Sequence, residues 1–124
     1  MTVTQTATVL VVEDTPSERA LISHFLQEAG YNVIYAVTAP EGLEKALAER
    51  PSLIITDVVM PGMSGFELCR SLKRAPELAK VPVIICSSKN QAIDRLWGMR
   101  QGADAYLTKP FDQEELLRVI KSVL

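Results

Sequence analysis

The sequence predicts a single α/β domain in which a parallel sheet is covered by helices on both faces. Short β-rich segments alternate with helix-length segments along the 124 residues, and this order is typical of parallel sheets with crossover helices. Three of the β-rich segments are continuously apolar, as expected for strands covered on both faces. Charged residues follow the apolar runs directly, namely Glu13-Asp14, Asp57 and Lys109. These residues are expected to converge at one edge of the sheet, where parallel α/β folds bind ligands.

The five strand candidates cover residues 8–12, 32–36, 53–57, 83–86 and 105–107. The first, third and fourth are predicted to be central because they are uniformly apolar. The second and fifth have shorter apolar runs and are predicted to be peripheral. Residues 8–124 are expected to form one domain, because no linker, repeat or low-complexity tract interrupts the pattern. Residues 1–7 are predicted to be a flexible leader.

Capping sequences mark the predicted helix starts. A serine, threonine or aspartate followed three residues later by glutamate forms a capping box, and each cap contributes about 1 kcal/mol. The candidates are Thr15–Glu18 (with Pro16 at the first helical position), Thr38–Glu41, Ser64–Glu67 and Asp112–Glu115, with Asn90 as the expected cap of the fourth helix.

Apolar residues at helical spacing predict the inward faces of the helices. On the fourth helix this spacing selects Ile93, Leu96 and Met99, and the neighbouring Trp97 is expected to pack against another helix. The other predicted inward positions are 21, 22, 25, 26 and 29; 43, 46 and 47; 66, 69 and 72; and 116, 117, 120 and 123. Gly30 is expected to end the first helix.

Composition restricts the classes of function. The formal net charge of −2 provides no basic surface for nucleic acid, and no apolar run approaches the roughly 20 residues of a membrane span. Cys69 and Cys86 lack metal-binding spacing and are expected to be buried thiols of a cytoplasmic protein. The single histidine, His24, is expected on a helix surface.

The charged residues at the strand ends predict phosphoryl chemistry. Carboxylates held close together repel one another, and a hard divalent cation or a lysine relieves that repulsion. Mg²⁺ prefers oxygen ligands and keeps several waters, so one or two carboxylates and a backbone carbonyl suffice. A carboxylate beside such an ion can attack phosphorus to form an acyl phosphate, while lysine and metal stabilise the charge on the transferring group.

The combined motifs resemble those of bacterial response-regulator receiver domains of the chemotaxis, or CheY-like, type. The matching segments are residues 12–14 (Val-Glu-Asp), Asp57 with residues 60–62 (Met-Pro-Gly), Ser87 after the fourth strand, and residues 109–111 (Lys-Pro-Phe). The resemblance extends from Val9 over the rest of the chain. It implies a flavodoxin-like (βα)5 fold with strand order 2-1-3-4-5. Residues 97–103 are also similar to receivers of type IV pilus motility pathways.

The resemblance also implies a role for each site residue. Asp57 is expected to accept the phosphoryl group. Mg²⁺ or Mn²⁺ is expected to be held by Asp14 and Asp57, by Glu13 through water and by the backbone carbonyl of Val59. Ser87 and Lys109 are expected to contact phosphoryl oxygens, and a cis peptide bond before Pro110 would aim Lys109 inward. Tyr106 is expected to couple its orientation to Ser87.

Phosphorylation adds about −1.5 to −2 charge at one point. Movement of Ser87 and Lys109 toward that charge would let Tyr106 turn inward, and the surface of the fourth helix, fifth strand and fifth helix would then change. The expected partners are a sensor histidine kinase or phosphotransfer domain and a downstream protein target. The domain itself is expected to be a monomer, able to dimerise when phosphorylated, and not an enzyme beyond self-catalysed phosphotransfer and dephosphorylation.

Val59 and Lys89 lie two residues after Asp57 and Ser87, on the expected path of attacking water. An apolar and a basic residue there differ from the polar or acidic residues of receivers that dephosphorylate quickly, so slow dephosphorylation is expected. Val59 also argues against a phosphatase of the haloacid-dehalogenase type, which places a second aspartate at that position. A flavodoxin-like FMN carrier is disfavoured because Glu13 and Asp14 would repel phosphate after the first strand.

The preferred interpretation is a receiver that acts alone in two-component signalling, in chemotaxis or pilus motility, since no effector domain follows Leu124. Two alternatives stay open at this point. The chain could be a receiver fragment of a larger regulator, or it could be a constitutive protein-binding module.

Overall fold

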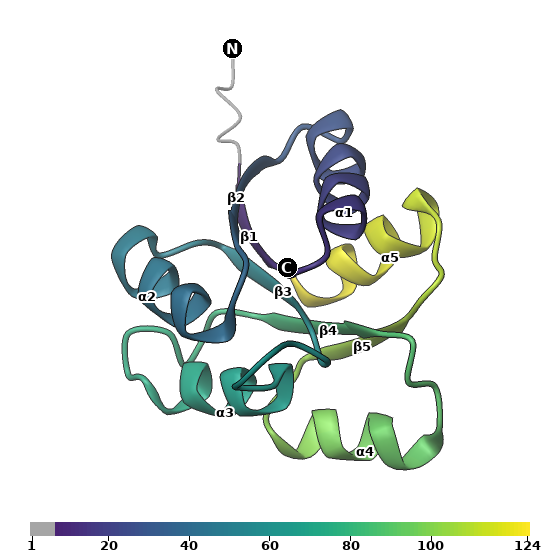
Figure 1. Ribbon diagram of the computed structural model, residues 1–124. Helices are drawn as coiled ribbons and strands as arrows, with labels where there is room; N and C mark the ends of the chain where they lie inside the picture. The colour runs from purple at the N-terminus through teal and green to yellow at the C-terminus, as the bar shows by residue number, and fades with distance from the viewer. Residues whose placement is uncertain (1–6) are drawn as a thin grey trace.

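The computed structural model describes residues 7–124, in which strands and helices alternate along the chain (Figure 1). The strands are β1 (Thr8–Val12), β2 (Asn32–Ala36), β3 (Leu53–Asp57), β4 (Val83–Ser87) and β5 (Ala105–Thr108). The helices are α1 (Pro16–Glu28), α2 (Ala39–Glu49), α3 (Gly65–Arg74), α4 (Ala92–Arg100) and α5 (Gln113–Val123). All five predicted strands are present, and β4 and β5 each extend one residue beyond the expected end.

The sheet is parallel throughout and has the order β2-β1-β3-β4-β5. The predicted strand order is therefore confirmed, with β2 and β5 at the edges. The register aligns the carboxyl ends, because Val12 pairs with Thr56, Asp57 with Cys86, and Ser87 with Thr108. The loops after β1, β3, β4 and β5 thus leave the sheet at one edge.

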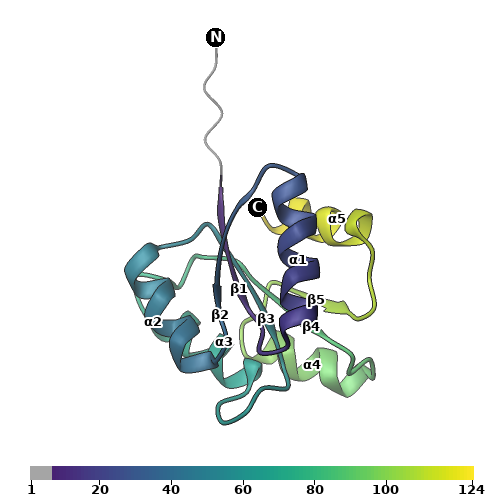
Figure 2. The same cartoon turned by 45° about the horizontal axis from the view of Figure 1, so that its top comes forward.

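Helices cover both faces of this sheet. Figures 1 and 2 show α1 and α5 on one face, and α2, α3 and α4 on the other. Successive strand residues point to opposite faces. Val9 and Val11 accordingly join the cluster with α1 and α5, whereas Leu10 and Val12 join the cluster on the opposite face.

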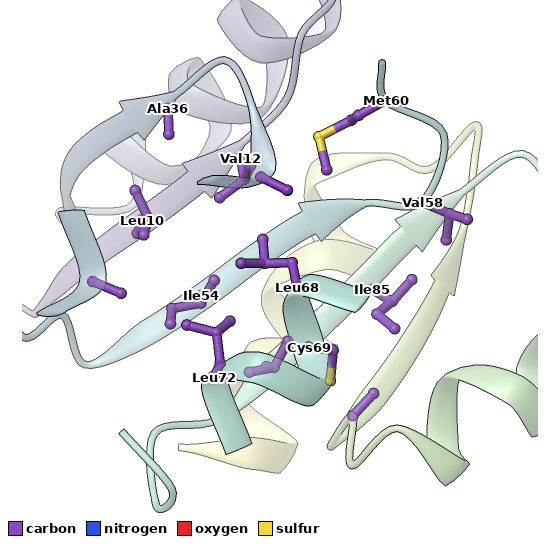
Figure 3. Packing of buried hydrophobic residues seen from close by; sticks show 14 of the residues in the cluster. Leu10, Val12, Ala36, Ile54, Val58, Met60, Leu68, Cys69, Leu72 and Ile85 are labelled. Carbon is purple, nitrogen blue, oxygen red and sulfur yellow. The ribbon is translucent and has the colours of Figure 1, made fainter. Parts of the chain in front are cut away.

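The cluster beneath α2 and α3 is shown in Figure 3, where Leu68 and Leu72 of α3 lie against Ile54 and Ile85 of the sheet. Each of these four side chains is at most 1% exposed. Burying one such side chain contributes about 1.5–3 kcal/mol. Cys69 and Cys86 are free thiols within the two clusters, as predicted, and burial raises the pKa of both, that of Cys69 to about 11.

Three of the predicted helix caps are confirmed. The side chains of Thr38, Ser64 and Asp112 each accept a hydrogen bond from the backbone N–H three residues later. The capping box at Asp112 is complete, because Glu115 also accepts from the Asp112 N–H. Gly30 has a φ of +96°, a conformation that suits glycine, and it follows the end of α1 as expected.

Two predicted caps differ in the structure. Thr15 is the N-cap residue of α1 and Pro16 follows it in the first turn, as predicted, but the capping box does not form. The Thr15 side chain makes no capping hydrogen bond, the Thr15 N–H donates to Glu13, and the Glu18 carboxylate contacts Lys109. The N-cap of α4 is Gln91 rather than Asn90, and the Asp94 carboxylate accepts a hydrogen bond from the Gln91 N–H at 3.1 Å. Gln91 takes the N-cap position because Asp94 lies three residues after it, the spacing at which an acidic side chain can accept from the N-cap N–H.

The predicted inward face of α4 is also wrong. Ile93, Leu96, Trp97 and Met99 are 47–55% exposed, and the buried residue of α4 is Gly98. A Cβ atom at Gly98 would lie 3.0 Å from the Tyr106 ring, so α4 approaches the sheet closely at a position without a side chain. The apolar stripe consequently points outward.

The predicted leader, residues 1–7, lies outside the described residues except for Ala7, whose carbonyl accepts a hydrogen bond from the Asn32 N–H at 3.0 Å. Within residues 7–124, no helix has the length and apolar character needed to cross a membrane. His24 lies on the exposed side of α1 and pairs with Glu28 at 3.1 Å.

Candidate functional site

The candidate site lies at the carboxyl edge of the sheet, between the loops that follow β1, β3 and β5. Glu13, Asp14 and Asp57 each offer a carboxylate oxygen there, and these oxygens all lie within 4.8 Å of one another. Parallel pairing of β1 with β3 brings the first two residues beside the third. The predicted convergence of charged residues is therefore observed.

Asp57 ends β3 with its side chain 11% exposed. Its Oδ1 accepts a hydrogen bond from the Val58 N–H at 2.8 Å, which fixes the orientation of the carboxylate. Burial raises the pKa of Asp57 above its ordinary value, although Lys109 opposes this effect. A half-buried carboxylate with uncompensated charge is a group that a cation would stabilise.

Glu13 is the most deeply buried carboxylate of the site, with a side chain 1% exposed. Its Oε2 accepts from the Thr15 N–H at 3.2 Å, and Arg19 donates to its backbone carbonyl at 2.9 Å. Burial raises the pKa of Glu13, and the nearby Asp57 charge adds to this effect. Asp14 is half-buried beside it.

Lys109 connects the carboxylates through its ammonium group. Its Nζ lies 2.7 Å from Glu13 Oε1, 2.9 Å from Glu18 Oε1 and 3.7 Å from Asp57 Oδ1. Burial lowers the pKa of Lys109, but the hydrogen bonds that its ammonium donates to Glu13 and Glu18 and the nearby charge of Asp57 together raise it further, so the amine stays charged. The Lys109–Pro110 peptide bond is cis, as the resemblance implied.

Ser87 and Tyr106 lie at the ends of β4 and β5. Ser87 is fully buried, and its Oγ accepts from the Lys89 N–H at 3.1 Å. Tyr106 is 8% exposed and its hydroxyl donates to the Lys89 carbonyl at 2.7 Å. The ring is therefore already inward in this structure, with the Arg95 guanidinium 5.4 Å from its centre.

The three carboxylates fit a hard divalent cation. All of their donors are oxygen atoms, which Mg²⁺ and Mn²⁺ prefer, and the burial of Glu13 and Asp57 leaves charge that Lys109 alone does not balance. Val59 directly follows Val58 in the loop after β3 and its side chain is 61% exposed. The ligand role of its backbone carbonyl stays a prediction.

Comparison with known proteins decides the family. The family model described as "Response regulator receiver domain" matches residues 9–121. The chain belongs to the response regulator receiver family. Its members' role in two-component signal transduction therefore applies to this receiver, and the resemblance seen in the sequence motifs is confirmed.

Relatives of this receiver differ in length. Protein PilH of Pseudomonas aeruginosa is 42% identical over 118 residues, which cover 95% of this chain and 98% of PilH. The transcriptional regulator RpaA of Synechocystis is 38% identical over 116 residues, which cover 94% of this chain but 48% of RpaA. The family thus includes relatives of similar length and others about twice as long.

Solved structures agree with the fold of this receiver. The chemotaxis response regulator CheY4 of Vibrio cholerae has a TM-score of 0.91 at 37% identity, covering 97% of this chain and all of CheY4. The receiver domain of the sensor histidine kinase PA1611 from Pseudomonas aeruginosa has a TM-score of 0.89 at 26% identity, covering 96% of this chain and 98% of that domain. The PA1611 structure has a magnesium ion coordinated in its active site cleft.

The sequence motifs missed one member of the site. The spacing from Thr15 predicts a capping role for Glu18, but its carboxylate contacts Lys109 across 91 residues of sequence. Its position in the first turn of α1, just after Asp14, was the available signal. Because α1 starts at the carboxyl edge of the sheet, a charged side chain in its first turn can reach the site.

Proposed function

We propose that Asp57 is the phosphoacceptor of this receiver and that Mg²⁺ assists the transfer. An Asp57 carboxylate oxygen attacks the phosphorus of a phosphohistidine on a kinase or phosphotransfer domain. The new O–P bond gives an acyl phosphate, the P–N bond breaks, and the imidazole leaves with a proton. The observation that carries this proposal is the meeting of three carboxylates within 4.8 Å with a lysine 3.7 Å from Asp57.

Different residues would bind the metal ion and stabilise the charge of the phosphoryl group. Glu13, Asp14 and Asp57 would hold Mg²⁺, which when bound neutralises charge on the transferring phosphoryl group. Lys109 is fully charged and would pair with a phosphoryl oxygen. Ser87 would donate its hydroxyl hydrogen to another phosphoryl oxygen, while its Oγ now accepts from the Lys89 N–H.

The same contacts supply a conformational response. Ser87 and Tyr106 both contact Lys89 in the loop between β4 and α4. A shift of Ser87 toward a phosphoryl oxygen would therefore move the loop to which the Tyr106 hydroxyl is bound. Arg95 extends the connection into α4, since it donates to the Tyr106 carbonyl and to Thr108 Oγ1 at 3.3 and 3.0 Å.

We further propose that partners bind the surface of α4, β5 and α5. The outward apolar residues of α4 support this assignment, because four large apolar side chains there are about half exposed. The 42% identity to PilH and the structural likeness to CheY4 favour a motility pathway of the pilus or chemotaxis type. A cytoplasmic location, the kinase, the target and dimerisation on phosphorylation stay predictions, as does action as a lone receiver.

The decisive experiment uses the single tryptophan, Trp97. The protein is titrated with Mg²⁺ and either acetyl phosphate or beryllofluoride, while Trp97 fluorescence and intact mass are recorded. Wild type should gain one phosphoryl group from acetyl phosphate and should change fluorescence with either compound, and Asp57→Asn should do neither. A response that persists in Asp57→Asn, or no response in wild type, would refute the mechanism.

Slow dephosphorylation is expected once the acyl phosphate has formed. Val59 and Lys89 are both exposed, and neither an alkyl group nor a lysine ammonium can accept a hydrogen bond from an attacking water and so orient it. The phosphorylated protein should persist for minutes or longer at neutral pH by intact mass. Val59→Asn should shorten that lifetime, and loss of the wild-type phosphoryl group within seconds would contradict the reasoning.

A further inference from the structure

Lys109 contacts one residue, Glu18, that the proposed mechanism does not use. Its ammonium lies within hydrogen-bond distance of Glu13 and Glu18, at 2.7 and 2.9 Å. The distance to Asp57 Oδ1 is 3.7 Å, beyond the normal range for a hydrogen bond. Lys109 is therefore bound to two glutamates rather than to the proposed phosphoacceptor.

The two glutamates differ in how easily each can give up its contact with the Lys109 ammonium. Glu13 is 1% exposed and belongs to the cluster of three carboxylates that fits a divalent cation. Glu18 is 43% exposed and lies outside that cluster. Because solvent screens an ion pair with one exposed partner, the Lys109–Glu18 pair is the weaker of the two contacts and the easier to exchange.

Space beside the pair lets Glu18 withdraw. A cavity of about 130 Å³ is lined by Glu18, Leu21, Ile22, Lys109, Pro110 and Phe111. Glu18 is in the first turn of α1, so its side chain can rotate toward this cavity or toward solvent without disturbing the buried residues Ile22 and Leu26 of the same helix.

We propose that Glu18 is a positioning residue that holds the Lys109 ammonium away from Asp57 in the unphosphorylated receiver and competes with the phosphoryl group for it. The proposal rests on the proposed function of Asp57 and Lys109. An ammonium has three N–H donors, and Glu18 engages one of them. Phosphorylation places more charge and further acceptor oxygens at Asp57, and Lys109 then exchanges Glu18 for a phosphoryl oxygen.

Removal of the Glu18 charge should therefore favour the activated state. In Glu18→Gln, beryllofluoride in saturating Mg²⁺ should bind about fivefold more tightly than in wild type, as reported by Trp97 fluorescence. That change corresponds to about 1 kcal/mol. Glu18→Asp, which keeps the charge but shortens the side chain, should fall between the two proteins. The matched control is Glu114→Gln on α5, which removes an 84% exposed carboxylate that pairs with Arg118.

A double-mutant cycle separates positioning from a general effect of charge. Glu18→Gln should no longer change the beryllofluoride affinity, or the rate of phosphorylation by acetyl phosphate measured by intact mass, when Lys109 is replaced by alanine. An equal gain in the Lys109→Ala background would mean that Glu18 acts on the anion directly, and this would overturn the proposal. The mass measurement provides a readout even if Lys109→Ala no longer changes Trp97 fluorescence.

The outcomes also distinguish this proposal from the proposed function. If wild type does not respond to beryllofluoride, the assignment of Asp57 fails. If wild type responds and Glu18→Gln binds beryllofluoride with unchanged or weaker affinity, only the role of Glu18 fails. Urea unfolding of Glu18→Gln should differ little from wild type, which would exclude a merely structural effect.

Discussion

Replacing Asp57 with asparagine should stabilise the fold when no divalent cation is present. The carboxylate oxygens of Glu13 and Asp14 lie within 4.8 Å of that of Asp57. At an effective dielectric constant near 20, each repulsion at 4.8 Å is about 3.5 kcal/mol. The attraction of Lys109 at 3.7 Å is about 4.5 kcal/mol on the same scale.

Repulsion on Asp57 therefore exceeds attraction by about 2 kcal/mol, and burial of the carboxylate acts in the same direction. Asparagine has a similar shape and can still accept from the Val58 N–H, so the hydrogen bond is kept. We expect Asp57→Asn to raise the free energy of unfolding at pH 7 by about 2 kcal/mol. For a chain of this size that is an increase in Tm of about 8 °C.

The assay is urea and thermal unfolding in EDTA and again in excess Mg²⁺. The gain should shrink in Mg²⁺, because cation binding to the folded state stabilises wild type more than the variant. Glu44→Gln is the matched control, since Glu44 is exposed on α2 and is not part of the carboxylate cluster. A variant no more stable than wild type in EDTA, or a gain of the same size in Mg²⁺, would refute the reasoning.

Three other predictions follow from the same geometry. Burial raises the folded-state pKa of Asp57 and Glu13, so these carboxylates take up protons in the folded protein as the pH falls, and their repulsion is relieved. The stability difference between wild type and Asp57→Asn, measured by urea titration, should therefore shrink from pH 7 toward pH 4. Gly98→Ala would place a Cβ 3.0 Å from the Tyr106 ring and 3.3 Å from Ile85 Cδ1, so it should lower the unfolding free energy by about 1–3 kcal/mol in the same titrations. The loss should be smaller in a Tyr106→Ala background, because the nearer of these two neighbours is then absent. In Gly65→Ala the added Cβ would overlap the Asp57 backbone carbonyl oxygen, so acetyl phosphate should label the protein at least tenfold more slowly by intact mass. A rate equal to that of wild type would contradict the close approach.

The sheet and the principal site residues could be predicted from the sequence because local signals specify them. Continuous apolar runs identify β1, β3 and β4 as central strands, and parallel pairing then places the residues that follow them at one edge. Asp57 and Lys109 could be placed together in this way without knowledge of any side-chain contact. The structure confirms that they meet.

The remaining features depend on packing between distant parts of the chain. Glu18 fits a capping box by spacing, yet its carboxylate pairs with Lys109, and the Thr15 N–H that it would have capped donates to Glu13 instead. On α4 the apolar spacing is regular, but helical periodicity identifies a face without showing which way it points. Gly98 determines which face of α4 is turned toward the sheet, because the helix packs closely against the sheet at the position that has no side chain.

The outward apolar face of α4 has a consequence for how the sequence can diverge. Leu96 and Trp97 are about half exposed, so polar replacements there should alter stability little, whereas truncating the fully buried Leu68 to alanine should cost about 2–5 kcal/mol. Selection for folding therefore constrains the inner side of α4, at Gly98, and leaves the outer side free to vary. Duplicated copies of such a receiver could acquire different partners through substitutions on this one helix while the phosphorylation site and the core stayed the same.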